Sequence, residues 1–311
     1  CFLLSPTGFV DNEDINEPSG IDIGGTNIRI GHTDENGKLA DFERVSTKEK
    51  FKNGNIEESM TVILKEYLDK YCQQYNVRQI AIGIPATLSA DREEILQVPN
   101  IKGMDHMFLG RTLEKNLGIP VALGKDVNML YFWDYHEKNL AEEGIGIGVY
   151  IGTGIGNAIF INGQPLTGKD GVAGELGHIP MIGGTGKCGC GNVACSECYA
   201  SGWHLVEIKD RYFPETDMGE LFTKHWGEPV LKEFVDNIAC VASTEMNILN
   251  PDSVIFGGGV INMKDFPKKY LQEKMYEHLR KPYPAESLDI QYSEDKVENG
   301  VKGAIIYAGK L

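Results

Sequence analysis

The sequence predicts two α/β domains that face each other across a cleft. Its 311 residues are more than one hydrophobic core usually supports. One supersecondary unit, a strand, a glycine turn and a second strand, occurs twice, at residues 20–26 and 148–154, and Asn-Gly follows each copy. Strands alternate with helical patterns along the rest of the chain, as in α/β domains. A repeat of this kind indicates two similar halves, and a coincidence of glycine-rich hairpins is the alternative.

The expected domain boundaries follow from the same pattern. A smaller N-terminal domain is predicted at residues 1–123 and a larger C-terminal domain at residues 124–297. A final helix over residues 300–310 is rich in small residues, so residues from about 298 to 311 are expected to pack back on the N-terminal half.

Composition excludes several classes of protein. The net charge of −15 argues against a nucleic-acid surface, which needs clustered Lys and Arg. The longest apolar runs are too short to cross a bilayer, so no membrane segment is expected. The first ten residues lack the basic start and cleavage pattern of a signal peptide, and we expect a terminus that is truncated or processed, because Met is absent. Seven cysteines, an odd number, fit a reducing cytoplasm.

The first elements surround a glycine turn. Residues 11–20 are acidic and turn-forming, so a poorly ordered lead-in is expected. A short apolar strand then ends at Ile23, an alternating strand covers residues 28–32, and Asn36-Gly37 forms a turn.

The glycine turn is a candidate phosphate site. Gly24 and Gly25 let the backbone approach an anion closely, and backbone amides and the Thr26 hydroxyl can donate to phosphate oxygens. Asp22 ends the strand beside them, where a carboxylate can orient Mg²⁺ or its waters. The simpler interpretation is a tight hairpin, because glycine turns are common.

The middle of the chain predicts mostly core elements. Residues 56–71 have the apolar spacing of a core-facing helix, residues 79–84 a buried strand, and residues 111–117 a short helix closed by Gly118. Asn100 follows Pro99, and a turn is the ordinary place for such an Asn.

A carboxylate follows the next strand, at residues 121–123. Asp126 lies on the turn into a helix that continues to about Lys138, and is therefore expected at the mouth of the cleft. A helix N-cap is a sufficient explanation for an Asp there, and a catalytic role is compatible with it.

The second copy of the repeat places Thr153 and Gly154 in its glycine turn, so a nucleotide is expected between the two halves. A helix over residues 231–249 and a buried strand over residues 252–256 follow. Three glycines, Gly257, Gly258 and Gly259, come directly after that strand and permit close approach of a flat ligand. A further helix is expected at about residues 264–279.

Residues 171–202 form a glycine-rich loop that is not explained as core. Within it, His178, Cys188, Cys190 and Cys195 offer one imidazole and three thiolates, a complete tetrahedral set for Zn²⁺ without an open position. We therefore predict a structural zinc that holds the loop, at residues 178–195, in shape. Buried reduced cysteines without a metal are the alternative, and a disulfide framework is less favoured.

The same loop carries a resemblance to a known family. GELGH at residues 174–178, followed by C-x-C-G-x-x-A-C-x-E-x-x-x-S-G at residues 188–202, resembles the signature of the ROK family of sugar kinases and repressors, in the actin and hexokinase superfamily. Ala194 stands where the family usually has Gly, which concerns the backbone conformation rather than the ligands, because Ala adopts most but not all conformations open to Gly.

The resemblance implies two ribonuclease H-like domains with an interdomain cleft. It also implies sugar-hydroxyl contacts from Asn100, Asp126, Glu175, His178 and Glu197, a general-base role for Asp126, and a first phosphate motif at residues 22–26. The triple-glycine turn at residues 257–259 would flank the adenosine of ATP. The family commonly has Asn before the catalytic Asp, and this chain has Lys125.

Phosphoryl transfer from ATP to a sugar fits this inventory, because the reaction depends mainly on positioning and charge neutralisation. Several segments look closer to bacterial D-allose kinases than to the family's glucokinases, so D-allose is the expected hexose. Glucose, fructose and N-acetylmannosamine are alternatives, as is a sugar sensor without catalysis. A repressor is not expected, because only about twenty residues precede the phosphate motif and a helix-turn-helix needs more. A homodimer is compatible with the family.

Overall fold

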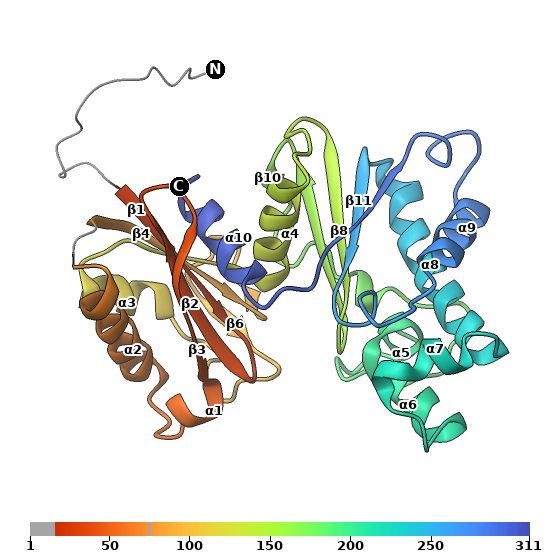
Figure 1. The fold of residues 1–311 in the computed structure, drawn as a ribbon, viewed down its shortest axis with the longest axis horizontal. Helices are drawn as coiled ribbons and strands as arrows, with labels where there is room; N and C mark the ends of the chain where they lie inside the picture. Colours follow the sequence, from red (N-terminus) through yellow and green to blue (C-terminus); the bar gives the residue numbers. More distant parts are fainter. Residues whose placement is uncertain (1–15, 74–75) are drawn as a thin grey trace. The chain divides into compact units, whose positions relative to one another are not determined.

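The computed structural model describes residues 16–73 and 76–311 (Figure 1). The expectations for residues 1–15, which concern a signal peptide and most of the lead-in, lie outside this part of the chain. The described chain divides into two compact units, unit 1 with the described residues up to Met129 and residues 300–311, and unit 2 with residues 130–299. This division lies inside a helix rather than before it, because Met129 still packs against Gly83 and Gly124 of unit 1.

Unit 1 is built on a five-stranded sheet with the order β3-β2-β1-β4-β7. The strands are β1 (Asn16–Ile23), β2 (Asn27–Thr33), β3 (Leu39–Ser46), β4 (Asn76–Ile84) and β7 (Val121–Lys125). Short strands β5 (Thr87–Leu88) and β6 (Ile95–Gln97) pair separately. The helices are α1 (Thr47–Lys50), α2 (Ile56–Tyr71), α3 (Leu109–Leu117) and most of α10 (Asn299–Ala308).

Unit 2 repeats this sheet, with the order β10-β9-β8-β11-β12. Its strands are β8 (Ile145–Ile151), β9 (Ile155–Ile161), β10 (Gln164–Pro165), β11 (Ser253–Gly257) and β12 (Asp289–Tyr292). Its helices are α4 (Asp126–Glu137, begun in unit 1), α5 (Glu197–Ala200), α6 (Gly202–Tyr212), α7 (Leu221–His225), α8 (Pro229–Leu249) and α9 (Lys268–His278), with 3₁₀ turns at Leu176–His178 and Met218–Glu220. In both sheets the first three strands in the order are antiparallel and the last two pairings are parallel, so the predicted repeat is confirmed.

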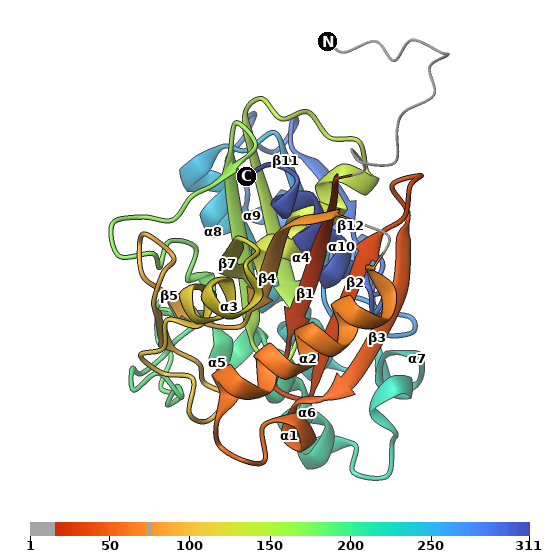
Figure 2. The same cartoon turned by 90° about the vertical axis from the view of Figure 1, so that its left-hand side faces the viewer.

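Successive side chains of β1 lie on opposite faces of the unit 1 sheet. Ile21 and Ile23 are fully buried in the core beneath α2 and α3, which lie over the same face (Figure 2). Gly20 and Asp22 lie on the other face, where a Cβ on Gly20 would be 2.3 Å from the Val301 carbonyl oxygen of α10. The strand therefore buries its isoleucines and leaves Asp22 on the face opposite that core.

Strand β8 shows the same division in unit 2. Ile147 and Val149 belong to the core that contains α8. Gly146 and Gly148 lie on the other face, where a Cβ on Gly148 would be 2.8 Å from the Tyr131 ring of α4. The glycines of β8 therefore let α4 pack closely on the sheet.

Several predicted elements are confirmed. Residues 56–71 form α2, residues 79–84 belong to β4, and the Asn36-Gly37 turn joins β2 to β3. The Asn162-Gly163 turn has φ of 50° and 73°, as a two-residue hairpin turn requires.

Other expectations were wrong at element ends. Residues 16–20 form the start of β1 rather than a lead-in, and the β1–β4 register shifts between Glu17 and Ser19, which accommodates Pro18. Helix α9 begins at Lys268 rather than near residue 264, directly after Pro267. No helix in the described ranges is long and apolar enough to cross a membrane.

Candidate active site

The turn between β1 and β2 is held by hydrogen bonds on both sides. The Gly24 amide donates to the Asn27 carbonyl oxygen at 2.9 Å, and the Thr47 hydroxyl donates to the Gly24 carbonyl oxygen at 2.7 Å. The Thr47 amide also donates to the Thr26 carbonyl oxygen at 3.0 Å. Gly25 and Thr26 remain exposed, so a fixed turn presents them to solvent. This is the rigid backbone that a phosphate site needs.

Asp22 lies beside this turn and forms an ion pair with Arg29. The two residues are cross-strand partners of β1 and β2, so their side chains share a face. Arg29 Nη1 donates to Asp22 Oδ2 at 2.6 Å. Burial raises the pKa of Asp22, and the Arg29 charge acts in the opposite direction. The sequence analysis missed Arg29, although its position opposite Asp22 across the turn was a usable signal.

Asp126 is the first residue of α4, directly after β7, and it is half-buried. Its Oδ1 accepts a hydrogen bond from the Val127 amide at 2.8 Å. Burial, together with the negative charge of Asp22, raises the pKa of Asp126 to about 6. A carboxylate with a pKa near neutrality is a candidate general base. The structure therefore brings Asp126 close enough to Asp22 for the two charges to interact.

A raised pKa alone does not identify a base in this chain. Asp134 lies on the same helix, and burial raises its pKa to about 6 as well. Both oxygens of Asp134 are occupied, however, since Oδ2 accepts from the Tyr150 hydroxyl at 2.8 Å and Oδ1 from the Ser293 hydroxyl at 2.6 Å. Asp134 is therefore a structural carboxylate, and the interaction of Asp126 with the charge of Asp22 distinguishes Asp126 from it.

Asn100 lies in an exposed turn, as its sequence context predicted, and next to the glycine turn. A Cβ on Gly25 would be 3.1 Å from the Asn100 Cβ. Unit 1 therefore brings together the predicted residues Asp22, Gly24, Gly25, Thr26, Asn100 and Asp126.

In unit 2, the turn between β8 and β9 is also fixed. The Gly202 amide donates to the Gly152 carbonyl oxygen at 2.9 Å, and the Trp203 amide donates to the Thr153 carbonyl oxygen at 3.0 Å. The first amides of α6 therefore hold this turn, while the Thr153 residue itself is exposed. Glu197 contacts the same turn, where its Oε2 accepts from the Ile155 amide at 3.0 Å and lies 2.2 Å from the Cβ position of Gly154.

The triple-glycine turn lies at the end of β11, next to the end of β8. Gly257 pairs with Tyr150, and Gly258 has φ of 88°, a conformation that favours glycine. A Cβ on Gly258 would be 2.6 Å from the Ile151 carbonyl oxygen, and Gly259 is exposed with open space around it. The two predicted nucleotide turns of unit 2 therefore meet at one edge of its sheet.

The four predicted metal ligands are assembled. One ligand atom from each of His178, Cys188, Cys190 and Cys195 lies within 4.8 Å of all the others. The Cys190 and Cys195 sulfurs are 3.7 Å apart, as are Cys188 Sγ and His178 Nδ1. Ligands of a tetrahedral zinc with Zn–S distances of about 2.3 Å are about 3.8 Å apart, so the spacing fits this ion. All six cysteines in the described ranges are free of disulfides.

His178 connects this group to the predicted sugar loop. Its Nδ1 faces Cys188, while its Nε2 lies 3.9 Å from Glu175 Oε2. Glu175 is exposed and His178 is half-buried. The ring therefore has one nitrogen toward the thiols and the other toward a carboxylate.

The sequence pattern of the ROK family matches residues 19–310. The chain belongs to the ROK family. It is 25% identical over 277 residues to the N-acetyl-D-glucosamine kinase of Salmonella newport, which covers 84% of this chain and 89% of the relative.

Solved structures of ROK proteins share the fold. A glucokinase from Streptomyces griseus, solved with glucose and AMPPNP, aligns with a TM-score of 0.76 at 24% identity over 95% of this chain and 100% of that one. A ROK transcriptional regulator, a homologue of the E. coli MLC protein, aligns with a TM-score of 0.80 at 20% identity over 95% of this chain and 78% of that one. Both units therefore have the actin and hexokinase type of α/β fold, as the resemblance predicted.

Ala194, the departure from the usual ROK glycine, occupies a glycine-like conformation. Its φ is 65°, in the left-handed region, and the residue is buried, directly before Cys195 in the chain. The backbone conformation that Gly normally supplies is thus retained, at the energetic cost of placing a Cβ there.

Two further polar residues, one of them next to Gly174, were missed by the sequence analysis. Glu245 of α8 and Asn157 of β9 are buried, and Asn157 Nδ2 donates to Glu245 Oε2 at 2.9 Å. Burial raises the pKa of Glu245 to about 7. Asn157 Oδ1 has no hydrogen-bond partner within the described chain, and it lies 2.9 Å from the Cβ position of Gly174, next to Glu175. Glu245 occupies a polar position within an amphipathic pattern, which gives no sign of burial.

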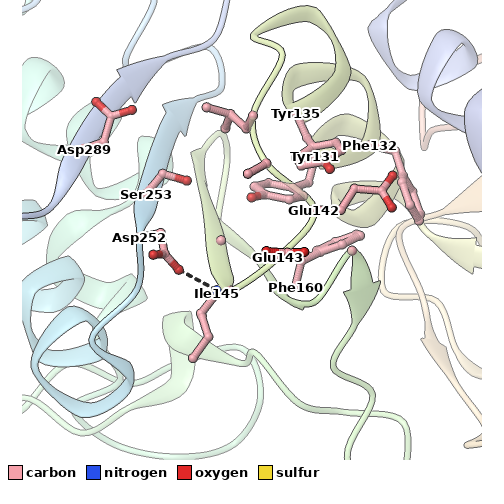
Figure 3. A pocket seen from close by; sticks show the side chains of 15 residues that line it. Tyr131, Phe132, Tyr135, Glu142, Glu143, Ile145, Phe160, Asp252, Ser253 and Asp289 are labelled. Carbon is pink, nitrogen blue, oxygen red and sulfur yellow. Dashed lines mark hydrogen bonds between the residues drawn. The ribbon is translucent and has the colours of Figure 1, made fainter. Parts of the chain in front are cut away.

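A separate cavity of about 180 Å³ lies at the start of β8, at the opposite end of that strand from the Thr153 turn (Figure 3). Tyr131 and Phe160 form part of its wall, and the Asp252 carboxylate accepts a hydrogen bond from the Ile145 amide there. None of the described residues that line it is Lys or Arg, and Glu142, Glu143, Asp252 and Asp289 are acidic. This electrostatic environment disfavours phosphate.

Proposed function

We propose that this ROK protein is an ATP-dependent hexose kinase that transfers the γ-phosphoryl group to the 6-hydroxyl of a sugar. The observation that supports this proposal most directly is Asp126, a half-buried carboxylate with a pKa of about 6 that interacts with the charge of Asp22. The kinase names of relatives such as the Salmonella protein, and the glucose and AMPPNP bound to the Streptomyces enzyme, support the same reaction class.

Asp126 acts as the general base in this proposal. It accepts the hydroxyl proton while the sugar oxygen forms a bond to the γ-phosphorus, and the bond from that phosphorus to the bridging oxygen breaks to release ADP. Since Oδ1 already accepts from Val127, Oδ2 is the oxygen available for the hydroxyl. A positioned base of this kind contributes roughly 100-fold to 10,000-fold in rate.

The glycine turns bind the nucleotide in this proposal. Gly24, Gly25 and Thr26, with Thr153 and Gly154, donate to phosphate oxygens, and the turn at residues 257–259 flanks the adenosine. Asp22 offers the oxygen ligand that Mg²⁺ prefers, and the ion would neutralise phosphate charge.

The sugar is bound by Asn100, Glu175, His178 and Glu197, with zinc on His178, Cys188, Cys190 and Cys195 as a structural support. Glu197 has one oxygen engaged with the Ile155 amide, so its second oxygen is the one available to a hydroxyl. The soft donor set and the spacing near 3.7 Å support zinc. D-allose remains one predicted substrate, and the relatives add N-acetyl-D-glucosamine to the candidates.

The proposed reaction is tested by replacing the base. Asp126→Asn keeps the size of the side chain and is expected to lower kcat about 100-fold to 10,000-fold in a coupled ADP-release assay. Asp134→Asn, on the same helix, is the matched control and is expected to lower stability while retaining kcat. Turnover by Asp126→Asn within a few-fold of the unsubstituted protein would contradict the role of Asp126.

The substrate is identified by kcat/KM with MgATP on allose, glucose, mannose, fructose, N-acetylmannosamine and N-acetylglucosamine. A site that hydrogen-bonds one epimer leaves a polar group unpaired with another, a difference of about 1 to 3 kcal/mol. One sugar is therefore expected to exceed its epimers by at least tenfold. ADP release with none of them would favour a sugar sensor without catalysis.

A further inference from the structure

Arg29 places a guanidinium directly at the turn that we propose to bind phosphate. The side chain comes from β2, on the same face of the sheet as Asp22. Its Nη1 is 2.6 Å from Asp22 Oδ2 and 3.6 Å from the position that a Cβ on Gly24 would take. The side chain is 23% exposed, so it is accessible to a ligand.

The charge balance around this turn favours such a cation. The chain has a net charge of −15, and Asp22 and Asp126 place two carboxylates near the turn. A triphosphate adds further negative charge, which backbone amides alone do not neutralise. Lys125 contributes positive charge next to Asp126, and Arg29 does so next to Asp22.

Arg29 does not use all of its hydrogen-bond donors, as a purely structural arginine would be expected to do. A guanidinium has five N–H donors in a planar fork that matches two oxygens at once. In the described part of the chain Arg29 uses Nη1 for Asp22, while its buried Nε has no partner. A buried donor without an acceptor is unfavourable, and a phosphate oxygen would satisfy it.

We propose that Arg29 is a phosphate-binding residue that exchanges Asp22 for the β- and γ-phosphates of the nucleotide. The exchange has two consequences. The fork of Arg29 binds two phosphate oxygens, and Asp22 Oδ2, released from its ion pair, becomes available to Mg²⁺. In the free protein the same ion pair keeps both charged groups compensated. This inference rests on the proposed function, because it assumes that the turn binds a nucleotide.

The proposal is tested by comparing nucleotides that differ in their terminal phosphates. Binding of AMPPNP and of AMP, each with Mg²⁺, is measured by isothermal titration calorimetry for the unsubstituted protein, Arg29→Met and Arg29→Lys. Arg29→Met is expected to weaken AMPPNP about 10-fold to 100-fold, the range for a charged hydrogen bond, and to change AMP less than about twofold. Arg29→Lys is expected to be intermediate, because it keeps the charge and loses the fork.

Arg111→Met is the matched control, since Arg111 forms an exposed ion pair with Glu93 at 2.7 Å in the same unit. It is expected to bind both nucleotides normally. Circular dichroism establishes whether each variant is folded. If Arg29→Met does not fold, Arg29→Lys alone is compared with the unsubstituted protein. In steady-state assays the Arg29 variants should raise the KM for ATP and leave the KM for sugar unchanged.

The outcomes separate the two proposals. Equal AMPPNP affinity in both Arg29 variants and the unsubstituted protein would overturn the role of Arg29 and leave the kinase proposal intact. Equal losses for AMPPNP and AMP would also overturn it, because they would indicate a structural role. If the Arg29 variants lose AMPPNP affinity as expected but the unsubstituted protein phosphorylates no sugar, the role of Arg29 is supported and the kinase proposal is contradicted. Failure of the unsubstituted protein to bind AMPPNP would overturn both.

Discussion

Replacing Glu245 by Gln should make unit 2 more stable above neutral pH. Glu245 is 7% exposed, and burial raises the pKa of its carboxyl group from 4.5 to about 7. The unfolded chain therefore releases this proton at a lower pH than the folded protein does. As the pH rises from about 4.5 to 7, the folded state retains a proton that the unfolded state has lost, so the free energy of unfolding decreases over this window.

The size of the effect follows from the two pKa values. Each tenfold difference in proton affinity corresponds to about 1.4 kcal/mol, so the ionised Glu245 costs the folded protein about 3 kcal/mol above pH 7. Gln does not titrate, and its carbonyl oxygen can accept the hydrogen bond that Glu245 accepts from Asn157 at 2.9 Å. Glu245→Gln is therefore expected to gain most of this amount relative to the unsubstituted protein between pH 5 and pH 8.

Urea unfolding followed by tryptophan fluorescence measures this difference. All three tryptophans, Trp133, Trp203 and Trp226, belong to unit 2, so the signal reports on the unit that contains Glu245. Glu233→Gln, an exposed position on the same helix, is the control and should change stability little at any pH. A stability difference between Glu245→Gln and the unsubstituted protein that is the same at pH 5 and pH 8 would refute the reasoning.

Three other predictions concern the site. The proposed base, Asp126, must be ionised to accept a proton, and its pKa is about 6. We therefore expect kcat/KM to fall about tenfold for each pH unit below 6. A kcat/KM that is constant from pH 7 to pH 5 would contradict the titration of Asp126. Ala194→Gly should raise the stability of the metal loop by about 1 kcal/mol, because Gly has no Cβ and adopts the left-handed φ of 65° without strain. Slower loss of zinc to a chelator would support this prediction, and faster loss would contradict it. Elemental analysis should find about one zinc per chain. Cys190→Ser should lower both the zinc content and the melting temperature. An unchanged melting temperature after chelation would indicate that the loop keeps its structure without a metal.

The sequence predicted most of the fold because its strongest patterns are local. The apolar spacing of residues 56–71 indicates a helix with one core-facing side, and the glycine turns with their flanking strands indicate the two hairpins. The cluster of one histidine and three cysteines was predictable for the same reason, since the four residues lie within 18 residues of the chain and their chemistry is specific. The start of β1 was missed because Pro18 argues against a strand, and only the bulge against β4 accommodates it.

The features that the sequence did not predict depend on contacts between segments that are distant in the chain. The ion pair of Asp22 and Arg29 depends on strand register, which the turn length implies but the composition does not. The hydrogen bond that Glu245 accepts comes from Asn157, which is 88 residues away in the chain. No local pattern distinguishes such a Glu from one that is exposed to solvent.

The two ring nitrogens of His178 have different neighbours, and this gives the proposed zinc an influence on the sugar site. If Nδ1 is bound to the metal, the neutral imidazole must carry its proton on Nε2. The side facing Glu175, 3.9 Å away, is then a hydrogen-bond donor in every molecule. Without the metal, both tautomers become accessible, and a fraction of the molecules would present an acceptor there instead. A metal that takes no part in phosphoryl transfer would thus decide whether this histidine gives or receives a hydrogen bond.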